Sequence, residues 1–168
     1  MNNKPALINY CIYDYPVGQL LLAGNCDGLQ HIQFECNISI EDNWKLDVKS
    51  FASVMAQLDE YFAKKRQRFD VKLNPQGTQF QKNVWNKLEQ IKFGKTKYYA
   101  EIAQEINNPK AARAIGMANN KNPIPIIIPC HRVIGKNGDL TGFASGLDIK
   151  QQLLELEGLI NVNLCLPL

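Results

Sequence analysis

"LINYCIYDYPVGQLLLAGNCDGLQHIQFE", residues 7–35, consists of short apolar runs that are broken twice. The breaks are Pro16-Val17-Gly18 and Asn25-Cys26-Asp27-Gly28, and both contain the residues that favour tight turns. Runs of strand length joined by such turns predict a β-hairpin or a meander. The stretch therefore predicts that the chain begins with a small antiparallel sheet.

A helix is predicted after the strands. Apolar residues recur at i, i+3, i+4, i+7, i+10 and i+11, the spacing of one helix face: Phe51, Val54, Met55, Leu58, Tyr61 and Phe62. "RFDVKL", residues 68–73, is predicted to return as one more strand, and "NPQG", residues 74–77, marks a boundary. We therefore expect an N-terminal α/β domain over residues 1–75.

From Thr78 onwards the pattern is helical. Thr78 and Gln81 have the spacing of a capping box, and an apolar stripe predicts a helix that ends near Phe93-Gly94; its residues are Phe80, Val84, Leu88 and Ile91. A shorter helix carries Tyr99, Ile102, Ala103 and Ile106 on one face. These features predict an all-helical C-terminal domain over residues 76–168, and an α+β fold for the whole chain.

A third helix is predicted from Pro109 to about Ala118, with Asn108 as its N-cap. Two short helices joined by a tight turn are a helix-turn-helix candidate. Its inward face consists of Ala111, Ala114, Ile115 and Ala118, which leaves Lys110, Arg113, Ala112 and Gly116 outside. A small, basic face suits a nucleic-acid groove, and close packing against another helix is an equally good explanation.

Charge is unevenly distributed along the chain, whose net charge is +3. Residues 1–76 carry eight Lys/Arg against nine Asp/Glu, whereas residues 77–168 carry eleven against seven. Between Lys82 and Lys136 the count is ten against three. This region is either a solvated basic face or a binding surface for a polyanion.

Composition limits the class of protein. With 168 residues, 45% of them hydrophobic and 21% charged, the chain is of ordinary globular type. It has no leader-like N-terminus and no apolar stretch of membrane-helix length, so we expect a cytoplasmic protein with no membrane partner. The five cysteines, an odd number, include Cys165 and predict reduced thiols. No CxxC or paired-histidine motif indicates a metal.

"PIPIIIPCHRVIGKNG", residues 123–138, places a cysteine beside a histidine after an aliphatic run. The prolines restrict backbone pairing, so the run is predicted to be a buried, extended segment outside any central strand. Cys130 is then either an inert core thiol or a reactive one whose thiolate is stabilised by His131 and Arg132. In an extended chain, His131 reaches Cys130 only around a bend or through a water.

A carboxylate lies at the end of the last helical pattern. Ile149, Leu153 and Glu157 form one row, and Glu157 lies in the last turn before Gly158, where the helix dipole disfavours a negative charge. Glu157 either turns out to water or pairs with His131 and orients the imidazole.

These segments resemble one protein family. "IPCHRV" (128–133), with "NPKAARAIG" (108–116), "NPIPIII" (122–128) and "GLDIKQQLLELEG" (146–158), is similar to the O6-alkylguanine-DNA alkyltransferases. The resemblance is dense from about residue 78 to residue 158. It implies DNA repair by direct, irreversible, single-turnover transfer of a methyl or alkyl group from O6-alkylguanine in duplex DNA to a cysteine of the protein itself. No cofactor is implied.

The resemblance also assigns roles to catalytic residues. Cys130 would be the alkyl acceptor, His131 its base through a water, and Glu157 the residue that orients His131. Asn122 would brace the turn beside the site. Tyr99 would donate a proton to the departing guanine.

The remaining implied roles concern DNA. Arg113 would fill the space of a nucleotide rotated out of the duplex, on a helix-turn-helix that enters the minor groove with Lys110, Ala112 and Gly116. The backbone at Cys130, Val133 and Ala144 would contact the base. The implied partner is double-stranded DNA, bound by a monomer. Cys11, Cys26 and His31 lack the spacing of the zinc ligands found in some relatives, so no metal is expected.

Two other functions stay open. One is a protein that binds damaged DNA without chemistry, against which Cys130 argues directly. The other is a cysteine hydrolase that uses Cys130, His131 and Glu157. A hydrolase would leave the basic region and Arg113 without a purpose.

Overall fold

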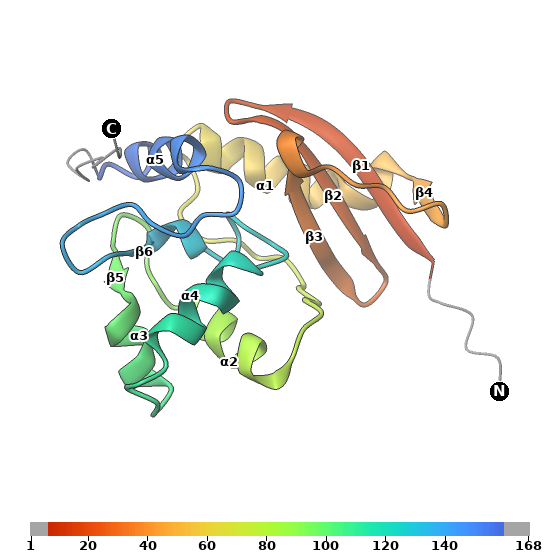
Figure 1. Ribbon diagram of the computed structural model, residues 1–168. Helices are drawn as coiled ribbons and strands as arrows, with labels where there is room; N and C mark the ends of the chain where they lie inside the picture. The colour runs from red at the N-terminus through yellow and green to blue at the C-terminus, as the bar shows by residue number, and fades with distance from the viewer. Residues whose placement is uncertain (1–6, 160–168) are drawn as a thin grey trace, which may run out of the picture. The chain divides into compact units, whose positions relative to one another are not determined.

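The structure, a computed structural model, describes residues 7–159 of the chain (Figure 1). Contacts divide the chain into two units, with the division between Gln76 and Gly77. The first unit is a sheet with a helix and the second is mainly helical, so the fold is of the α+β class. Within residues 7–159, no helix has the length and apolar character needed to cross a membrane.

The first three strands form the predicted antiparallel meander. They are β1 (Ile8–Tyr15), β2 (Gly18–Asn25) and β3 (Gly28–Phe34), followed by a short 3₁₀ turn, η1 (Glu35–Asn37). A fourth strand, β4 (Trp44–Leu46), pairs in parallel with β1, so the sheet is mixed and not purely antiparallel. The sequence shows no strand pattern for β4, because the strand has only three residues and two of them are exposed.

The predicted helix is present as η2 (Val48–Phe51) and α1 (Ala52–Phe62). It lies along the sheet and contacts β1 (Figure 1). It buries Phe51, Val54, Leu58 and Tyr61. The predicted strand over residues 68–73 is wrong, since only one isolated bridge joins Leu73 to Leu29. Both backbone groups of Asp70 instead bond to the Gln57 side chain. The Asp70 N–H donates to the Gln57 amide oxygen at 2.7 Å, and the Gln57 amide nitrogen donates to the Asp70 carbonyl at 2.8 Å. A backbone held by a helix side chain cannot extend a strand ladder.

The second unit begins with the predicted capping box. The Thr78 hydroxyl accepts from the Gln81 N–H, and the Gln81 side chain accepts from the Thr78 N–H, at the start of α2 (Gln79–Leu88). The helix ends earlier than predicted, because Ile91 N–H bonds to the carbonyl three residues back, at Leu88. Trp85, which is 1% exposed, donates from its indole to the carbonyl of Ala118 at 2.9 Å.

Two short helices follow, α3 (Tyr99–Glu105) and α4 (Ala112–Asn120), and they pack against each other. The predicted start of α4 at Pro109 is wrong. The Asn108 carbonyl accepts from Ala111 N–H at 2.9 Å in a separate turn, and the helix begins at Ala112 without a side-chain cap.

The second unit is not all-helical, which corrects the prediction. A two-residue strand, β5 (Lys97–Tyr98), pairs in parallel with β6 (Val133–Ile134). A 3₁₀ turn, η3 (Cys130–Arg132), comes directly before β6, and α5 (Leu147–Leu156) closes the described chain. The β5–β6 pair ties the start of α3 to the segment that carries Cys130.

Candidate active site

Cys130 lies in the interior of the second unit, as the first residue of η3. Cys130 is only 3% exposed, and residues 125–128, which come before Pro129, are buried as well. The Cys130 N–H bonds to the carbonyl of Ile128 at 2.8 Å. The chain therefore bends at Cys130 and His131, whereas an extended chain would point their side chains to opposite faces.

The aliphatic run before Cys130 is a turn, which corrects the prediction of an extended segment. Ile128 N–H bonds to Ile124 carbonyl at 2.9 Å, and Ile126 has φ of 74°, a value that β-branched residues rarely adopt. Asn122 holds the turn at both ends: its amide donates to Ile128 carbonyl at 2.7 Å and its oxygen accepts from Ile124 N–H at 3.0 Å. A single side chain thus stabilises a strained backbone immediately before the cysteine.

His131 and Glu157 are in contact, which is one of the two alternatives that the sequence left open and the one that the resemblance implied. His131 Nε2 lies 2.8 Å from Glu157 Oε1, and both side chains are fully buried. Glu157 caps α5 at its C-terminal end, with Gly158 next at φ of 84°. The predicted neighbour in the helix row, Ile149, is half-buried.

Arg132 is a second partner of Glu157, which the sequence did not reveal. Its Nε and Nη2 both donate to the carboxylate at 2.9 Å, and its Nη1 donates to the carbonyl of Ile91 at 2.5 Å. Glu157 Oε2 also accepts from the N–H of Gly94 at 3.0 Å. The carboxylate therefore joins η3, the end of α5 and the segment after α2.

These contacts decide the proton positions. Burial alone would raise the pKa of Glu157, but the hydrogen bonds from His131 and Arg132 and the positive charge of Arg132 outweigh it and hold that pKa at about 2. Burial lowers the pKa of His131, so its imidazole is neutral. Because the ionised carboxylate can only accept, the proton is on Nε2. Nδ1 then carries a lone pair, and it has no hydrogen-bond partner within the described part of the chain.

The thiol of Cys130 is not activated by Arg132, which corrects that expectation. Burial raises the pKa of Cys130 to about 11, so the resting group is a neutral thiol. A hydrogen bond from Asn122 and the charge of Lys150 act in the opposite direction and favour the thiolate. The guanidinium of Arg132 is occupied by Glu157.

Lys150 is the site residue that sequence reasoning missed. It lies on α5 with 0% exposure, and Nζ donates to the carbonyl of Val133 at 2.6 Å and to that of Thr141 at 2.7 Å. The sequence does contain a signal, because Lys150 precedes Leu153, Leu154 and Glu157 at the i, i+3, i+4, i+7 spacing of a buried stripe.

Tyr99, at the start of α3, reaches the same loop. Its hydroxyl donates to the carbonyl of Thr141 at 3.2 Å, and burial raises its pKa, so the group is protonated. Gly142, next in the loop, has φ of 64°, and a Cβ there would lie 2.9 Å from the Tyr99 hydroxyl. Val133 is buried beside the site, whereas Ala144 is exposed.

The outer face of α4 differs from the predicted one. Gly116 faces Tyr99 and, like Ala112, is half-buried, while Ala114 is exposed and not inward. The exposed residues follow helical spacing through the preceding turn and the helix; they are Lys110, Arg113, Ala114, Met117, Asn120 and Lys121. We call this set the α4 face. Three of its members are cationic.

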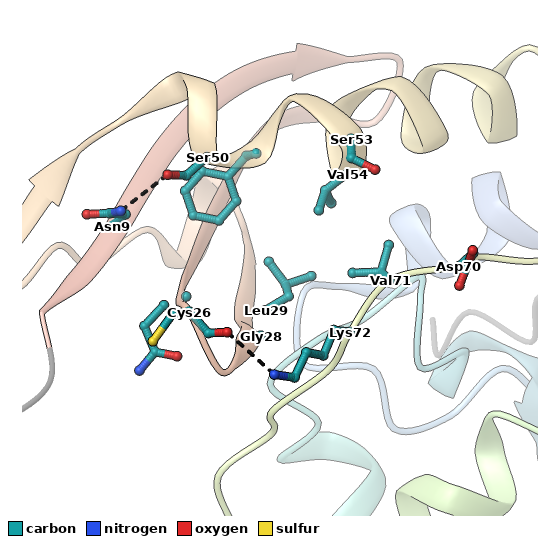
Figure 2. A pocket seen from close by; sticks show the side chains of 13 residues that line it. Asn9, Cys26, Gly28, Leu29, Ser50, Ser53, Val54, Asp70, Val71 and Lys72 are labelled. Carbon is teal, nitrogen blue, oxygen red and sulfur yellow. Dashed lines mark hydrogen bonds between the residues drawn. The ribbon is translucent and has the colours of Figure 1, made fainter.

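The first unit contains a cavity of about 450 Å³. It lies between the β2–β3 hairpin, the start of α1 and residues 70–72 (Figure 2). None of the predicted site residues lines it. Within residues 7–159, no three His, Cys, Asp or Glu side chains are grouped so as to hold a metal ion. Cys165 lies outside the described residues.

Both units match family models. Residues 8–75 match the model described as "6-O-methylguanine DNA methyltransferase, ribonuclease-like domain". Residues 79–159 match the one described as "6-O-methylguanine DNA methyltransferase, DNA binding domain", and all predicted site residues lie within this second range.

Individual relatives are similar over most of their length. A methylated-DNA–protein-cysteine methyltransferase of Methanosarcina acetivorans is 54% identical over 152 residues, which cover 89% of this chain and 97% of the relative. One from Mycobacterium tuberculosis is 44% identical over 153 residues, covering 90% and 93%. Among solved structures, M. tuberculosis OGT in complex with DNA superposes with a TM-score of 0.85 at 46% identity, covering 89% of this chain and 92% of that one.

Proposed function

The chain belongs to the 6-O-methylguanine DNA methyltransferase family, and from this membership we infer that it repairs DNA by transferring the alkyl group of an O6-alkylguanine to one of its own cysteines. The observation that best supports Cys130 as that cysteine is the geometry next to it. His131 is buried, neutral and hydrogen-bonded to Glu157 through Nε2, with Nδ1 left as an unused base.

The other described cysteines lie in the first unit and differ from Cys130 in burial or in the charge beside them. Cys26 and Cys36 are exposed, and Cys11 is buried in the first unit, where burial and then the charge of Asp47 raise its pKa to about 11. A carboxylate beside a thiol opposes ionisation, whereas Cys130 has Lys150. Cys130 combines the charge of Lys150 with a histidine next to it in the chain.

The proposed reaction begins with removal of the thiol proton. His131 takes the proton at Nδ1, through a water, and Glu157 stabilises the imidazolium that forms. The thiolate attacks the alkyl carbon; the S–C bond forms and the C–O6 bond breaks. The guanine takes a proton from the Tyr99 hydroxyl, which is restored from His131, so the thiol proton is transferred to the base overall. The product is a thioether that nothing in the site cleaves, so each molecule acts once.

Binding to duplex DNA is assigned to α3 and α4 as a helix-turn-helix. In this proposal the α4 face enters the minor groove, Lys110 and Lys121 contact phosphates, and Arg113 replaces the nucleotide that rotates into the site. The half-buried Ala112 and Gly116 act by allowing close packing against α3 and the DNA. Val133 and Ala144 supply backbone contacts to the base, while Asn122 holds the turn before Cys130. We further expect a monomer in the cytoplasm.

The test is the mass of the Cys130 peptide after incubation with a duplex that contains O6-methylguanine. Alkyl transfer adds the mass of one CH₂ to that peptide and to no other cysteine peptide. Binding of the duplex without a mass gain would instead identify a protein that binds damage without repairing it. Repeated turnover of an ester or amide would identify a hydrolase.

Arg113→Ala is expected to separate duplex repair from the chemistry itself. Removing the guanidinium should slow transfer from an O6-methylguanine duplex roughly 10- to 100-fold, because the duplex closes against the rotated nucleotide. Transfer from free O6-benzylguanine should hardly change, since no stack has to be opened. Rates on both substrates, followed by the mass of the Cys130 peptide, measure this. Equal losses on both would contradict the assigned role.

Affinity for DNA is expected to fall as salt rises. Each phosphate neutralised contributes a slope of about −0.9 to the plot of log affinity against log salt. Lys110→Ala and Lys121→Ala should each make the slope shallower by about that amount. Lys65→Ala, which removes an exposed lysine of the first unit, is the matched control and should leave the slope unchanged. A slope that responds equally to all three would place the DNA elsewhere.

A further inference from the structure

Lys150 is a buried cation without an anionic partner. Its side chain is 0% exposed, and none of the ion pairs between described residues includes it. The two groups that bind its Nζ are neutral carbonyls, of Val133 and Thr141. Burying an ammonium group in this way is unfavourable, and burial accordingly lowers the pKa of Lys150 to about 8.

Among the charged groups around Cys130, one positive charge has no negative counterpart. Arg132 and Glu157 neutralise each other, His131 is neutral, and Tyr99 is a protonated phenol. Lys150 is therefore the free positive charge that acts on Cys130 among these groups, and Cys130 is the ionisable group whose charge acts on Lys150. A cation with no partner in the resting protein acquires one when the thiol ionises.

The hydrogen bonds of Lys150 also organise the loop next to the site. Thr141 carbonyl accepts from both Lys150 Nζ and the Tyr99 hydroxyl, so α3 and α5 are joined at one oxygen. Val133 carbonyl belongs to β6, which continues directly from η3 and Cys130. Lys150 thereby connects the nucleophile segment with the residue assigned as proton donor.

We propose that Lys150 is a positioning residue of the alkyl transfer: its ammonium group is the counter-charge for the Cys130 thiolate, and its two hydrogen bonds hold Val133 and Thr141 beside the base. The inference rests on the proposed function. The charge is needed only while the sulfur is anionic, from loss of the thiol proton to His131 until the S–C bond forms. Preorganised charge of this kind stabilises the reacting state at no cost of reorganisation.

The first experiment compares Lys150→Met with Lys150→Arg and with Lys136→Met, an exposed lysine of the following loop. The rate of transfer from free O6-benzylguanine to Cys130 is measured across pH, and thermal unfolding confirms that each variant is folded. Lys150→Met should react about tenfold or more slowly at neutral pH, with the inflection of the profile about one unit or more higher. Lys150→Arg should keep the inflection, and Lys136→Met should match the unmodified protein.

A folded Lys150→Met with an unchanged inflection would overturn the proposal, including the case in which its rate falls equally at every pH. If Lys150→Met does not fold, the unmodified protein provides the test. Lysine ¹³Cε signals are titrated by NMR, and the rate of transfer from free O6-benzylguanine is measured over the same pH range. If the thiolate reacts with the Lys150 ammonium as its counter-charge, the rate should stop rising with pH where Lys150 loses its proton, near pH 8. A rate that keeps rising unchanged through the titration of Lys150 would overturn the proposal.

The two proposals fail in different ways. If the unmodified protein gains no alkyl group from any O6-alkylguanine, the proposed function fails. If it gains the group normally while the Lys150 measurements show no coupling to Cys130, only the role of Lys150 fails.

Discussion

Cys130→Ser is expected to abolish alkyl transfer while the protein still binds duplex DNA. A hydroxyl ionises far less readily than a thiol, and in this site burial already holds the pKa of the thiol at about 11. The proton of a serine would therefore stay in place even with His131 Nδ1 available. Transfer from an O6-methylguanine duplex should fall below detection, measured as mass gain on the peptide of residue 130.

DNA affinity supplies the control for this variant. The α4 face lies on another element and should be unaffected, so fluorescence anisotropy with the same duplex should give a dissociation constant close to that of the unmodified protein. Cys26→Ser, which removes an exposed thiol of the first unit, should transfer normally. A Cys130→Ser protein that still removes methyl groups from DNA would show that another residue is the acceptor.

Glu157→Ala is expected to destabilise the protein by about 3–5 kcal/mol, because it leaves a buried guanidinium uncompensated. Glu157 accepts three bonds from Arg132, one from His131 and one from the backbone of Gly94. All of these donors lose their acceptor together. The free energy of unfolding from urea titration measures the loss, and transfer to Cys130 should fall as well, since His131 is no longer oriented.

Glu157→Gln separates charge from shape in the same position. It keeps the side chain's size and one acceptor oxygen, so its loss should be smaller than that of Glu157→Ala. If the two variants were equally stable, or if both matched the unmodified protein, the network would not be holding the unit together.

Stability should depend on pH in a way that Glu157 dictates. Its pKa is about 2 in the folded protein and near the ordinary 4.5 in the unfolded chain, so the folded state favours the ionised form. The resulting stabilisation, roughly 3 kcal/mol, is fully present above about pH 4.5 and is lost as pH falls through about 2. Unfolding free energies of Glu157→Gln should decline less over that interval.

Local signals in the sequence predict the structure correctly where neighbouring residues decide it. The two turns of the meander and the capping box at Thr78 and Gln81 depend on residues within a few positions of one another, and the structure confirms both. The apolar row placed Glu157 at the end of a buried helix face and left open whether it turns to water or to His131, and the structure shows the contact with His131. The turns and the capping box follow from a spacing that is visible along the chain.

The sequence predicts the wrong conformation where distant residues compete for the same backbone. The strand predicted over residues 68–73 is displaced by Gln57, which takes both backbone groups of Asp70. The extended run before Cys130 is bent because Asn122 bonds to both ends of it. Periodicity and propensity depend on neighbouring residues and do not reveal hydrogen bonds from side chains elsewhere in the chain. The sequence alone therefore predicts the conformation that each segment would prefer on its own.

By itself, then, the sequence determined the fold class and the family resemblance, because residue type and spacing carry that information, and through the resemblance it predicted which sulfur, imidazole and carboxylate react. The electrostatic state of the site was decided only by tertiary structure. Whether Arg132 activates Cys130 or binds Glu157, and whether Lys150 points to water or into the site, depends on which groups are brought together from η3, α3 and α5 and on how completely water is excluded there.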